Sequence, residues 1–324
     1  MKALVTGATG FIGSHLAAAL SKRGYKVTCL VRKTSNLTWL DGVDVRLIEG
    51  DCSDRNSLDA CVRGQDYIFH LAGLTKAVSR EHFYAVNAKG TENLIEAASE
   101  TAPGIKRFLY LSSLSAFGPR IGGSLPTEDE TPHPVSEYGK SKLNGEYAVL
   151  KYASSIPATI LRPSVVYGPR DKDFFLLFKS IGRGFTPYWG DGRTSLLYVD
   201  DLVEGVILAA ESEIAAGKTY FISDGGVYSN SEIISGISSA LGVKTVRVRI
   251  PKSLLSVIGF FSDGISKITG ENIIINSDKI REIMYPEWVC DVTRAKKDLN
   301  FQPAVDMKKG IIWTADWYRI HKWL

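Results

Sequence analysis

Short apolar runs alternate with longer amphipathic segments along the first half of the chain. The amphipathic segments repeat their apolar residues at helical spacing, as in residues 11–24 and 86–100. Near-continuous apolar strands separated by helices are typical of a parallel sheet covered by helices on both faces. The pattern therefore predicts an α/β fold with a doubly wound parallel sheet, whose strands are residues 2–6, 26–31, 44–49, 66–72, 106–112 and 157–162.

This alternation breaks after residue 165. Helical patterns dominate from there on, with short strands at residues 218–223 and 245–250 and an amphipathic helix in residues 301–324. We expect residues 1–165 to form a dinucleotide-binding domain and residues 166–324 a smaller, mostly helical substrate-binding lobe. That lobe is built discontinuously and can return a strand or helix to the first domain. Without a flexible linker, the two parts should pack tightly with a cleft between them.

Composition narrows the setting. The chain of 324 residues is 44% apolar with a net charge of +4, and no basic run interleaves with aromatic residues, so nucleic acid is not an expected partner. The four cysteines form no CxxC pair, which favours free thiols in a reducing compartment. No export signal precedes the first strand, and the apolar run 254–261 is too short to span a bilayer. We expect a cytoplasmic protein without a membrane partner.

A glycine-rich turn follows the first predicted strand. Gly7, Gly10 and Gly13 lie between that strand and an alanine-rich helix. In such a turn the first glycine permits a tight bend, the second lets the backbone approach a pyrophosphate, and the third allows close helix packing. The helix N-terminus offers free N–H groups and the positive end of its dipole to the phosphates. The turn predicts a dinucleotide site in a Rossmann-type sheet.

Candidate catalytic residues lie on a predicted helix and on the strand before it. Tyr138 and Lys142 are four residues apart, which places both side chains on one helix face. A free tyrosine titrates near pH 10, so an adjacent cation is needed to make it a proton shuttle at neutral pH. Ser112, Ser113 and Ser115 follow an apolar strand at the edge where open parallel sheets bind ligands. A serine there could hold a substrate oxygen.

Taken together, these motifs resemble those of the extended short-chain dehydrogenases/reductases, also called the NAD-dependent epimerase/dehydratase family. The resemblance covers about the first 210 residues in the family's order and returns in the closing “GIIWTADWY”. Its pieces are “TGATGFIG”, “GD” at 50–51, “HLAG” at 70–73, “VNAKGTENL”, “LSSLSAFG”, “YGKSK”, “LRPSVVYGP” and “YVDDLV”.

The resemblance implies a role for each matching residue. Ser113 is implied as the catalytic serine, Tyr138 as the acid/base, and Lys142 as the residue that lowers its pKa and holds the nicotinamide ribose. A homodimer through two surface helices per subunit is implied as well. The expected cofactor-binding residues are Gly7, Thr9, Gly10, Phe11, Ile12, Gly13, Arg32, Asp51, Cys52, Leu71, Ala72, Gly73, Asn87, Tyr138, Lys142, Pro163 and Val166.

Departures from the family pattern narrow the reaction. Sugar-nucleotide dehydratases carry an Asp-Glu pair where this chain has Leu114 and Ser115, and leucine cannot donate a proton, so we reject dehydration. Ser164 replaces an asparagine that helps hold a substrate diphosphate. Thr194 and Ser195 replace an Arg-Asp pair, with Arg193 one step earlier. Ser164 and Arg193 are candidate substrate contacts, and Arg170 or Lys179 could substitute for the missing phosphate contacts.

The departures favour branches similar to dihydroflavonol reductases and 3β-hydroxysteroid dehydrogenases, which act on a carbonyl or secondary alcohol of a larger, less charged molecule. Aromatic residues of the second lobe would suit such a substrate, although the near-helical spacing of Phe174, Phe175 and Phe178 favours a core position. The alternative is a nucleotide-sugar epimerase that retains NAD tightly, and a remote one is a non-catalytic cofactor sensor. The five histidines form no metal-binding motif, so we expect no metal.

The second strand bears on the choice of cofactor. Val31 stands where NAD-preferring relatives carry an acid for the adenosine ribose, and Arg32 and Lys33 follow it. Without the acid, nothing repels a 2′-phosphate, and Arg32 can pair with that phosphate or stack on adenine. Lys33 and Ser35 could help. The sequence therefore predicts NADP in preference to NAD, with an enzyme that accepts either as the alternative.

Overall fold

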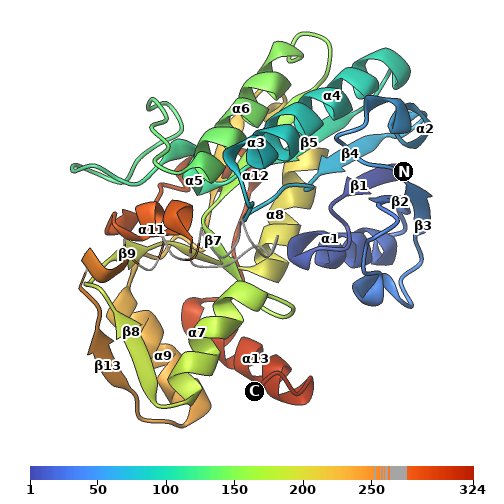
Figure 1. Ribbon diagram of the computed structural model, residues 1–324. Helices are drawn as coiled ribbons and strands as arrows, with labels where there is room; N and C mark the ends of the chain where they lie inside the picture. The colour runs from blue at the N-terminus through green and yellow to red at the C-terminus, as the bar shows by residue number, and fades with distance from the viewer. Residues whose placement is uncertain (252, 256, 258, 260–261, 263–275) are drawn as a thin grey trace.

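A seven-stranded, wholly parallel sheet forms the centre of the protein (Figure 1). The computed structural model describes all residues except 252, 256, 258, 260–261 and 263–275. In spatial order the strands are β11 (Thr219–Ile222), β6 (Ala158–Pro163), β5 (Arg107–Leu111), β4 (Tyr67–His70), β1 (Lys2–Thr6), β2 (Lys26–Val31) and β3 (Arg46–Glu49). The predicted α/β fold class is confirmed.

Helices cover both faces of this sheet. One face packs against α1 (Phe11–Lys22), α8 (Val199–Glu211) and α12 (Thr293–Leu299). The other packs against α2 (Asp59–Val62), α4 (Gly90–Thr101) and α6 (Glu137–Lys151). Every residue of the central strands β4, β5 and β6 is buried, which explains why their sequences are apolar runs rather than alternating patterns.

The second half of the chain contributes to this sheet. Strand β11 pairs with β6, with Ile222 opposite Pro163, and so adds a seventh strand beyond the six of the first half. Helix α8 packs on the same core as α1. The chain therefore crosses between the sheet and the second lobe more than once, and the predicted boundary at residue 165 stays a prediction.

Among the described residues, the second lobe has a core shared by α7 (Lys172–Gly182), α9 (Asn230–Leu241) and α13 (Met307–Ile320). Phe178 is fully buried in their shared core, and Phe174 and Phe175 pack against it, so these rings belong to the core. None of the described helices combines the length and apolarity needed to cross a bilayer. Several short strands were not predicted because two to four residues carry too little periodicity: β7 (Val165–Tyr167), β8 (Phe185–Tyr188), β9 (Arg193–Thr194), β10 (Leu196–Tyr198), β12 (Tyr228–Ser229) and β14 (Glu287–Trp288).

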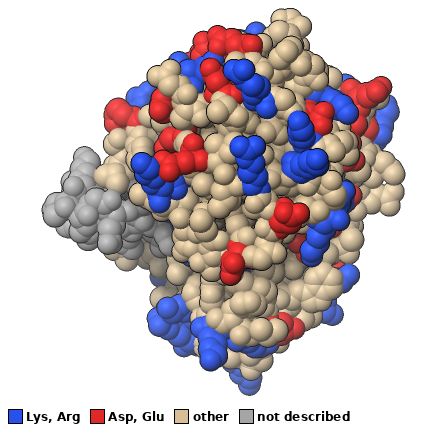
Figure 2. All heavy atoms as spheres, turned by 90° about the vertical axis from the view of Figure 1, so that its right-hand side faces the viewer, with Lys and Arg blue, Asp and Glu red and all other residues tan. Residues whose placement is uncertain are grey.

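The remaining elements are short and lie mostly in the connections. They are the helices α3 (Arg80–Phe83), α5 (Leu114–Phe117) and α11 (Ser277–Ile283), strand β13 (Val246–Arg249), a π-helical turn over Tyr84–Lys89, and the 3₁₀ turns Thr38–Leu40, Arg55–Ser57 and Glu213–Ala215. On the face shown in Figure 2, acidic and basic side chains are interspersed over most of the surface.

Candidate active site

One edge of the sheet gathers most of the predicted site residues. In a parallel sheet the carboxyl ends of all strands meet at the same edge. The turn after β1, and the residues after β2 to β6, therefore lie side by side although they are far apart in sequence. The predicted residues at these strand ends are Gly7, Thr9, Gly10, Arg32, Asp51, Cys52, Leu71, Ala72, Gly73, Ser113 and Pro163.

The turn after β1 is built so closely that glycine is required at two positions. Gly7 has φ +70°, and a Cβ there would lie 2.7 Å from the backbone nitrogen of Ala72. A Cβ on Gly13 would lie 2.1 Å from the carbonyl oxygen of Gly7. Within the described chain no side chain caps α1, which starts at Phe11, and no acid lies in its first turn. The uncapped N–H groups fit an anionic pyrophosphate.

Ser113 and Tyr138 lie at the starts of two different helices, and their side chains interact. Ser113 caps α5, where its Oγ accepts from the backbone N–H of Ser115 at 3.1 Å. Tyr138 lies in the first turn of α6, and its phenol is hydrogen-bonded to the Ser113 side chain. Burial raises the pKa of Tyr138 to about 12, and the Ser113 hydrogen bond opposes that rise. The phenol is therefore protonated at neutral pH.

Lys142 lies one turn further along α6, and its side chain is buried. Its Nζ donates to the carbonyl oxygen of Leu111 at 2.6 Å and lies 4.3 Å from the centre of the Tyr110 ring. Burial lowers the pKa of Lys142 to about 7, while the negative charge of Glu146 opposes this shift. At neutral pH this side chain is poised between its charged and neutral forms, a property of proton-transfer groups.

A buried ion pair joins α6 to strand β6. Both carboxylate oxygens of Glu146 accept from Arg162 on β6, at 2.9 and 2.6 Å, and the Ser112 hydroxyl donates to the same carboxylate at 2.5 Å. Neither side chain of the ion pair is more than 6% exposed. A bidentate pair of this kind fixes the helix relative to the strand, because breaking it would leave a buried charge uncompensated.

His70 lies in a buried hydrogen-bond chain. Thr91 Oγ1 donates to the carbonyl of Asn87 at 2.7 Å, so it accepts from His70 Nε2 at 2.9 Å. His70 Nδ1 then accepts from Thr6 Oγ1 at 2.7 Å, and that oxygen accepts from the Ala72 N–H at 3.1 Å. Burial and the nearby Lys142 charge lower the pKa of His70 to about 3. A neutral histidine therefore ties the loop after β4 to the π-helical turn.

Asn87 also holds the loop after β4, through Leu74. Its Oδ1 accepts from the Leu74 N–H at 2.7 Å, and its Nδ2 donates to the Leu74 carbonyl and to Ser141 Oγ, both at 2.9 Å. A Cβ on Gly73 would lie 3.1 Å from Asn87 Oδ1 and 3.6 Å from Lys142 Nζ. Gly73, Asn87 and Lys142 therefore lie side by side, although the amide of Asn87 is occupied by protein groups. Its cofactor contact stays a prediction.

The end of β2 presents cationic groups. Arg32 is exposed, and its backbone N–H donates to Ser35 Oγ at 3.0 Å. Its charge acts to lower the pKa of Cys52, which burial raises overall to about 12, so the guanidinium lies near the predicted adenine pocket. Within the described chain this guanidinium has no ion-pair partner. Lys33, in contrast, pairs with Glu49 at 3.5 Å.

The two predicted substrate residues lie near β6 and the short strands beyond it. Ser164 stands between β6 and β7, and Arg193 lies in β9. Val166, predicted to contact the cofactor, lies in β7. Arg193 pairs with Glu287, which also accepts from Arg120 at 2.9 Å, so a protein carboxylate already engages its guanidinium. The alternative cation Arg170 donates to Ser14 at 3.0 Å. The buried hydroxyls of Ser164 and Ser195 have no partner among the described residues.

Helix α11 contributes residues that sequence reasoning missed. Asp278 accepts from the backbone N–H groups of Glu137 at 2.6 Å and Tyr138 at 3.0 Å. Glu282 accepts from Ser136 Oγ at 2.8 Å. These contacts join residues about 140 positions apart, and no local motif marks them. The charge of Glu282 raises the pKa of Tyr138 and that of Lys279 lowers it.

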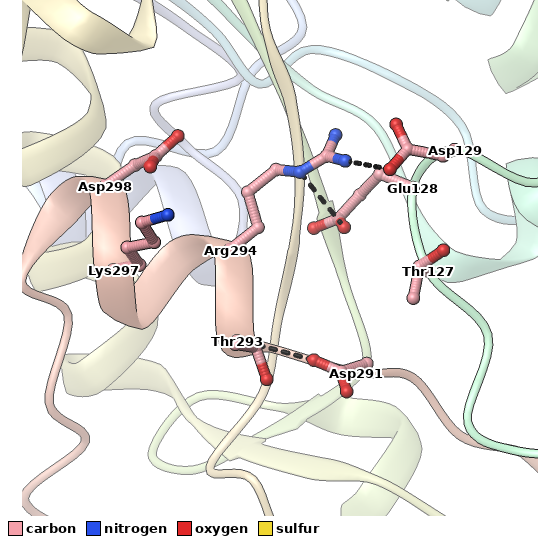
Figure 3. A pocket seen from close by; sticks show the side chains of 8 residues that line it. All are labelled: Thr127, Glu128, Asp129, Asp291, Thr293, Arg294, Lys297 and Asp298. Carbon is pink, nitrogen blue, oxygen red and sulfur yellow. Dashed lines mark hydrogen bonds and ion pairs between the residues drawn. The ribbon is translucent and has the colours of Figure 1, made fainter.

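A cavity of about 410 Å³ lies elsewhere, between the loop at residues 127–129 and α12 (Figure 3). Its charges satisfy one another: Arg294 pairs with Glu128 at 3.5 Å and with Asp129 at 2.5 Å. Glu128 also accepts from the backbone N–H of Phe221 on the edge strand β11 at 2.8 Å. The cavity includes none of the three catalytic candidates, and its carboxylates have structural partners, so we do not assign the reaction to it.

The groups around Tyr138 are suited to proton transfer. In the part of the chain that the structure describes, no group of three or more His, Cys, Asp or Glu side chains is arranged to hold a metal ion. The groups that act on the phenol are the Ser113 side chain and the charges of Glu282 and Lys279.

Proteins similar to this chain over nearly its whole length include reductases, dehydrogenases and epimerases. The chain is 28% identical to the ceramide reductase of Caulobacter vibrioides, covering 99% of this chain and 95% of that protein. It is 28% identical to a 3β-hydroxysteroid dehydrogenase/Δ5→4-isomerase of Mycobacterium tuberculosis, covering 96% and 88%. Its fold matches UDP-glucuronic acid 4-epimerase from Bacillus cereus, solved with UDP-glucuronic acid and NAD, with a TM-score of 0.80, 25% identity and coverage of 99% and 100%.

A family model reaches the same conclusion from sequence. The model for the NAD dependent epimerase/dehydratase family matches residues 3–223, a span that runs from the first strand to the end of β11 and includes the glycine turn, Ser113, Tyr138 and Lys142. The family predicted from the motifs is thereby confirmed, and the chain belongs to the NAD dependent epimerase/dehydratase family of extended short-chain dehydrogenases/reductases.

Proposed function

We propose that this protein is an NAD(P)-dependent reductase or dehydrogenase that acts on a secondary alcohol or ketone carbon of a small molecule. Two observations support the proposal. The Tyr138 phenol interacts with Ser113, and Lys142 lies one turn further along the same helix with its Nζ on the Leu111 carbonyl oxygen, at the carboxyl edge of the sheet. When bound, the nicotinamide supplies or accepts the hydride. The residues of this chain then have to hold the substrate oxygen and move one proton.

Protonation favours the reducing direction. Because burial raises the pKa of Tyr138 to about 12, the free enzyme carries a phenol that can donate its proton to a carbonyl oxygen as hydride reaches the carbon. Ser113, already hydrogen-bonded to the phenol, orients the same oxygen. The cation at Lys142 stabilises the tyrosinate that remains, and its pKa of about 7 lets it return a proton at neutral pH.

Substrate class follows from what the site lacks. Leu114 and Ser115 offer no Asp-Glu pair for dehydration, and Arg193 is engaged by Glu287. A diphosphate would have to displace that carboxylate, which favours a substrate without phosphate groups. We therefore propose a larger, mainly apolar ketone, the class to which the names of the ceramide reductase and steroid dehydrogenase relatives point.

NADP is the proposed cofactor. Val31 supplies no acid at the end of β2, and Arg32 is exposed without an ion-pair partner in the described chain. A 2′-phosphate would give that guanidinium a partner at a charge-assisted distance. The residues proposed to hold the cofactor are those around the turn and the strand ends named above, from Gly7 to Val166.

One purification distinguishes the reductase from its rival, a nucleotide-sugar epimerase. The protein is denatured, any released nucleotide is identified, and the native protein is titrated with NADPH and NADH. Nicotinamide absorbance is then followed with a ceramide-type ketone, a 3-oxosteroid and UDP-glucuronic acid. Exchangeable NADPH and consumption of it with a ketone support the proposal. Tightly retained NAD and epimerised UDP-sugar without net oxidation would replace it.

Assembly and compartment complete the proposal. We propose a homodimer in which α4 and α6 of each subunit meet, since Tyr147 and Leu150 on α6 are 51% and 46% exposed. The four cysteines are free and buried, which suits a reducing compartment such as the cytoplasm. Light scattering of wild type and Leu150→Asp tests the dimer, which the variant should dissociate.

A further inference from the structure

The start of α6 is held by a second lobe of the protein. The first N–H groups of a helix have no partner within it and need acceptors from elsewhere. Ser136 supplies one acceptor locally, since its Oγ accepts from the Gly139 N–H at 3.0 Å. The N–H groups of Glu137 and Tyr138 are satisfied by the carboxylate of Asp278, at 2.6 and 3.0 Å.

Helix α11 makes a second contact that fixes the local cap. The Ser136 hydroxyl donates to Glu282 Oε1 at 2.8 Å, so the hydroxyl that caps α6 is itself oriented from α11. Lys279 holds the other oxygen of Glu282 at 2.9 Å. The side chains of Asp278 and Glu282 are only 15% and 8% exposed, which makes these contacts internal packing rather than surface pairs.

Asp278 thus touches the backbone of Tyr138 itself. A carboxylate at a helix N-terminus is favoured by the helix dipole as well as by its hydrogen bonds. The phenol of Tyr138 must also stay within hydrogen-bond reach of Ser113, which belongs to a different element, α5. Two separate contacts therefore position Tyr138: Ser113 interacts with its hydroxyl, and Asp278 accepts from its backbone N–H.

We propose that Asp278 is a positioning residue for Tyr138, so that docking of α11 completes the reaction site. This inference rests on the proposed acid/base role of Tyr138. A small displacement of the Tyr138 hydroxyl would weaken its hydrogen bond to the substrate oxygen and lower the rate of proton transfer. The glycine turn after β1, which is proposed to bind the cofactor, would not move. Loss of Asp278 should therefore lower kcat and leave the dissociation constant of the cofactor unchanged.

The chain offers a matched control. Asp201 also accepts from two consecutive backbone N–H groups of a distant segment, those of Ala304 at 2.9 Å and Val305 at 3.0 Å. It is 6% exposed, so it is a buried carboxylate clamp like Asp278. Among the described residues, none of its hydrogen bonds reaches α6. Asp201→Asn and Asp278→Asn therefore remove the same charge from the same kind of clamp, and only the second should change Tyr138.

The experiment compares Asp278→Asn, Asp278→Ala and Asp201→Asn with wild type. Hydrogen exchange of the peptide containing residues 136–139 should rise about tenfold in Asp278→Ala, the size of a lost helix cap, and stay at the wild-type rate in Asp201→Asn. kcat for the ketone accepted by wild type should fall about 10- to 100-fold in Asp278→Ala and less in Asp278→Asn, which keeps one acceptor oxygen. Cofactor affinity should stay at the wild-type value throughout.

Two outcomes overturn the proposal in different ways. Faster exchange at the start of α6 with unchanged kcat in both Asp278 variants would leave Asp278 a purely structural cap. Undiminished turnover in Tyr138→Phe would instead remove the proposed function, whatever the Asp278 variants do. If Asp278→Ala does not fold, hydrogen exchange and kcat are both measured on Asp278→Asn.

Discussion

The buried ammonium of Lys142 and the carboxylate of Glu146 lie one turn apart on α6, and the carboxylate is the charge that opposes deprotonation of the lysine. Burial is the larger influence and lowers the pKa of Lys142 to about 7. Glu146 is at the same time held by Arg162 in a bidentate pair. The electrostatic state of Lys142 is thus set by the core of the protein.

This lowered pKa makes stability depend on pH. Between pH 7 and the usual pKa of lysine, the unfolded chain binds a proton that the folded chain has released, so stability rises with pH across that window. Relative to Lys142→Met, the cofactor-free wild type should gain on the order of 2 kcal/mol between pH 7 and pH 9. Urea unfolding of both proteins at the two pH values measures the difference. Equal pH dependence would show that Lys142 titrates normally.

The glycine turn gives a steric prediction. A Cβ on Gly13 would lie 2.1 Å from the Gly7 carbonyl oxygen, whereas a Cβ on Gly182 at the end of α7 would meet only Leu241 Cδ1, at 3.7 Å. Gly13→Ala should therefore cost about 2 to 3 kcal/mol of unfolding free energy and weaken cofactor binding. Gly182→Ala serves as the control: it should leave cofactor binding unchanged and should not lower the unfolding free energy, because alanine is the better helix former. Wild-type cofactor affinity in Gly13→Ala would contradict the close packing of the turn.

Cofactor preference should depend on the charge of Arg32. Arg32→Asp places a negative charge where a 2′-phosphate would lie, so the ratio of NADPH to NADH affinity should fall about tenfold or more. Lys26→Asp makes the same charge change at the opposite end of β2 and should leave the ratio as in wild type. Fluorescence titration with both cofactors gives the ratios. An unchanged ratio in Arg32→Asp would remove the case for NADP.

Much of the fold could be predicted from short stretches of sequence, because strands, helices and the glycine turn each have a local sequence pattern. The strand predicted at residues 26–31 coincides with β2, since a buried parallel strand is a continuous apolar run bounded by polar residues. The Rossmann-type sheet and the family are confirmed. The three catalytic candidates were found because each belongs to a short motif at a strand end or on one helix face.

What the sequence could not reveal depends on contacts between distant segments. The hold of Asp278 on the start of α6 spans 140 residues, and nothing near Asp278 distinguishes it from a surface acid. The engagement of Arg193 by Glu287 is likewise invisible in “GDGRTSLLYVDD”. The hydrogen-bond chain through His70 required knowing that β1, β4 and the π-helical turn are neighbours.

The central claim is that the Tyr138 hydroxyl moves the proton of the reaction, and the most direct measurement is the turnover of Tyr138→Phe. This variant removes one oxygen and keeps the ring that packs 6.1 Å from Phe83. With the ketone that wild type reduces, kcat should fall at least about 100-fold, the contribution of a positioned general acid, while NADPH binds with wild-type affinity. Turnover close to the wild-type rate, with the cofactor bound normally, would contradict the account.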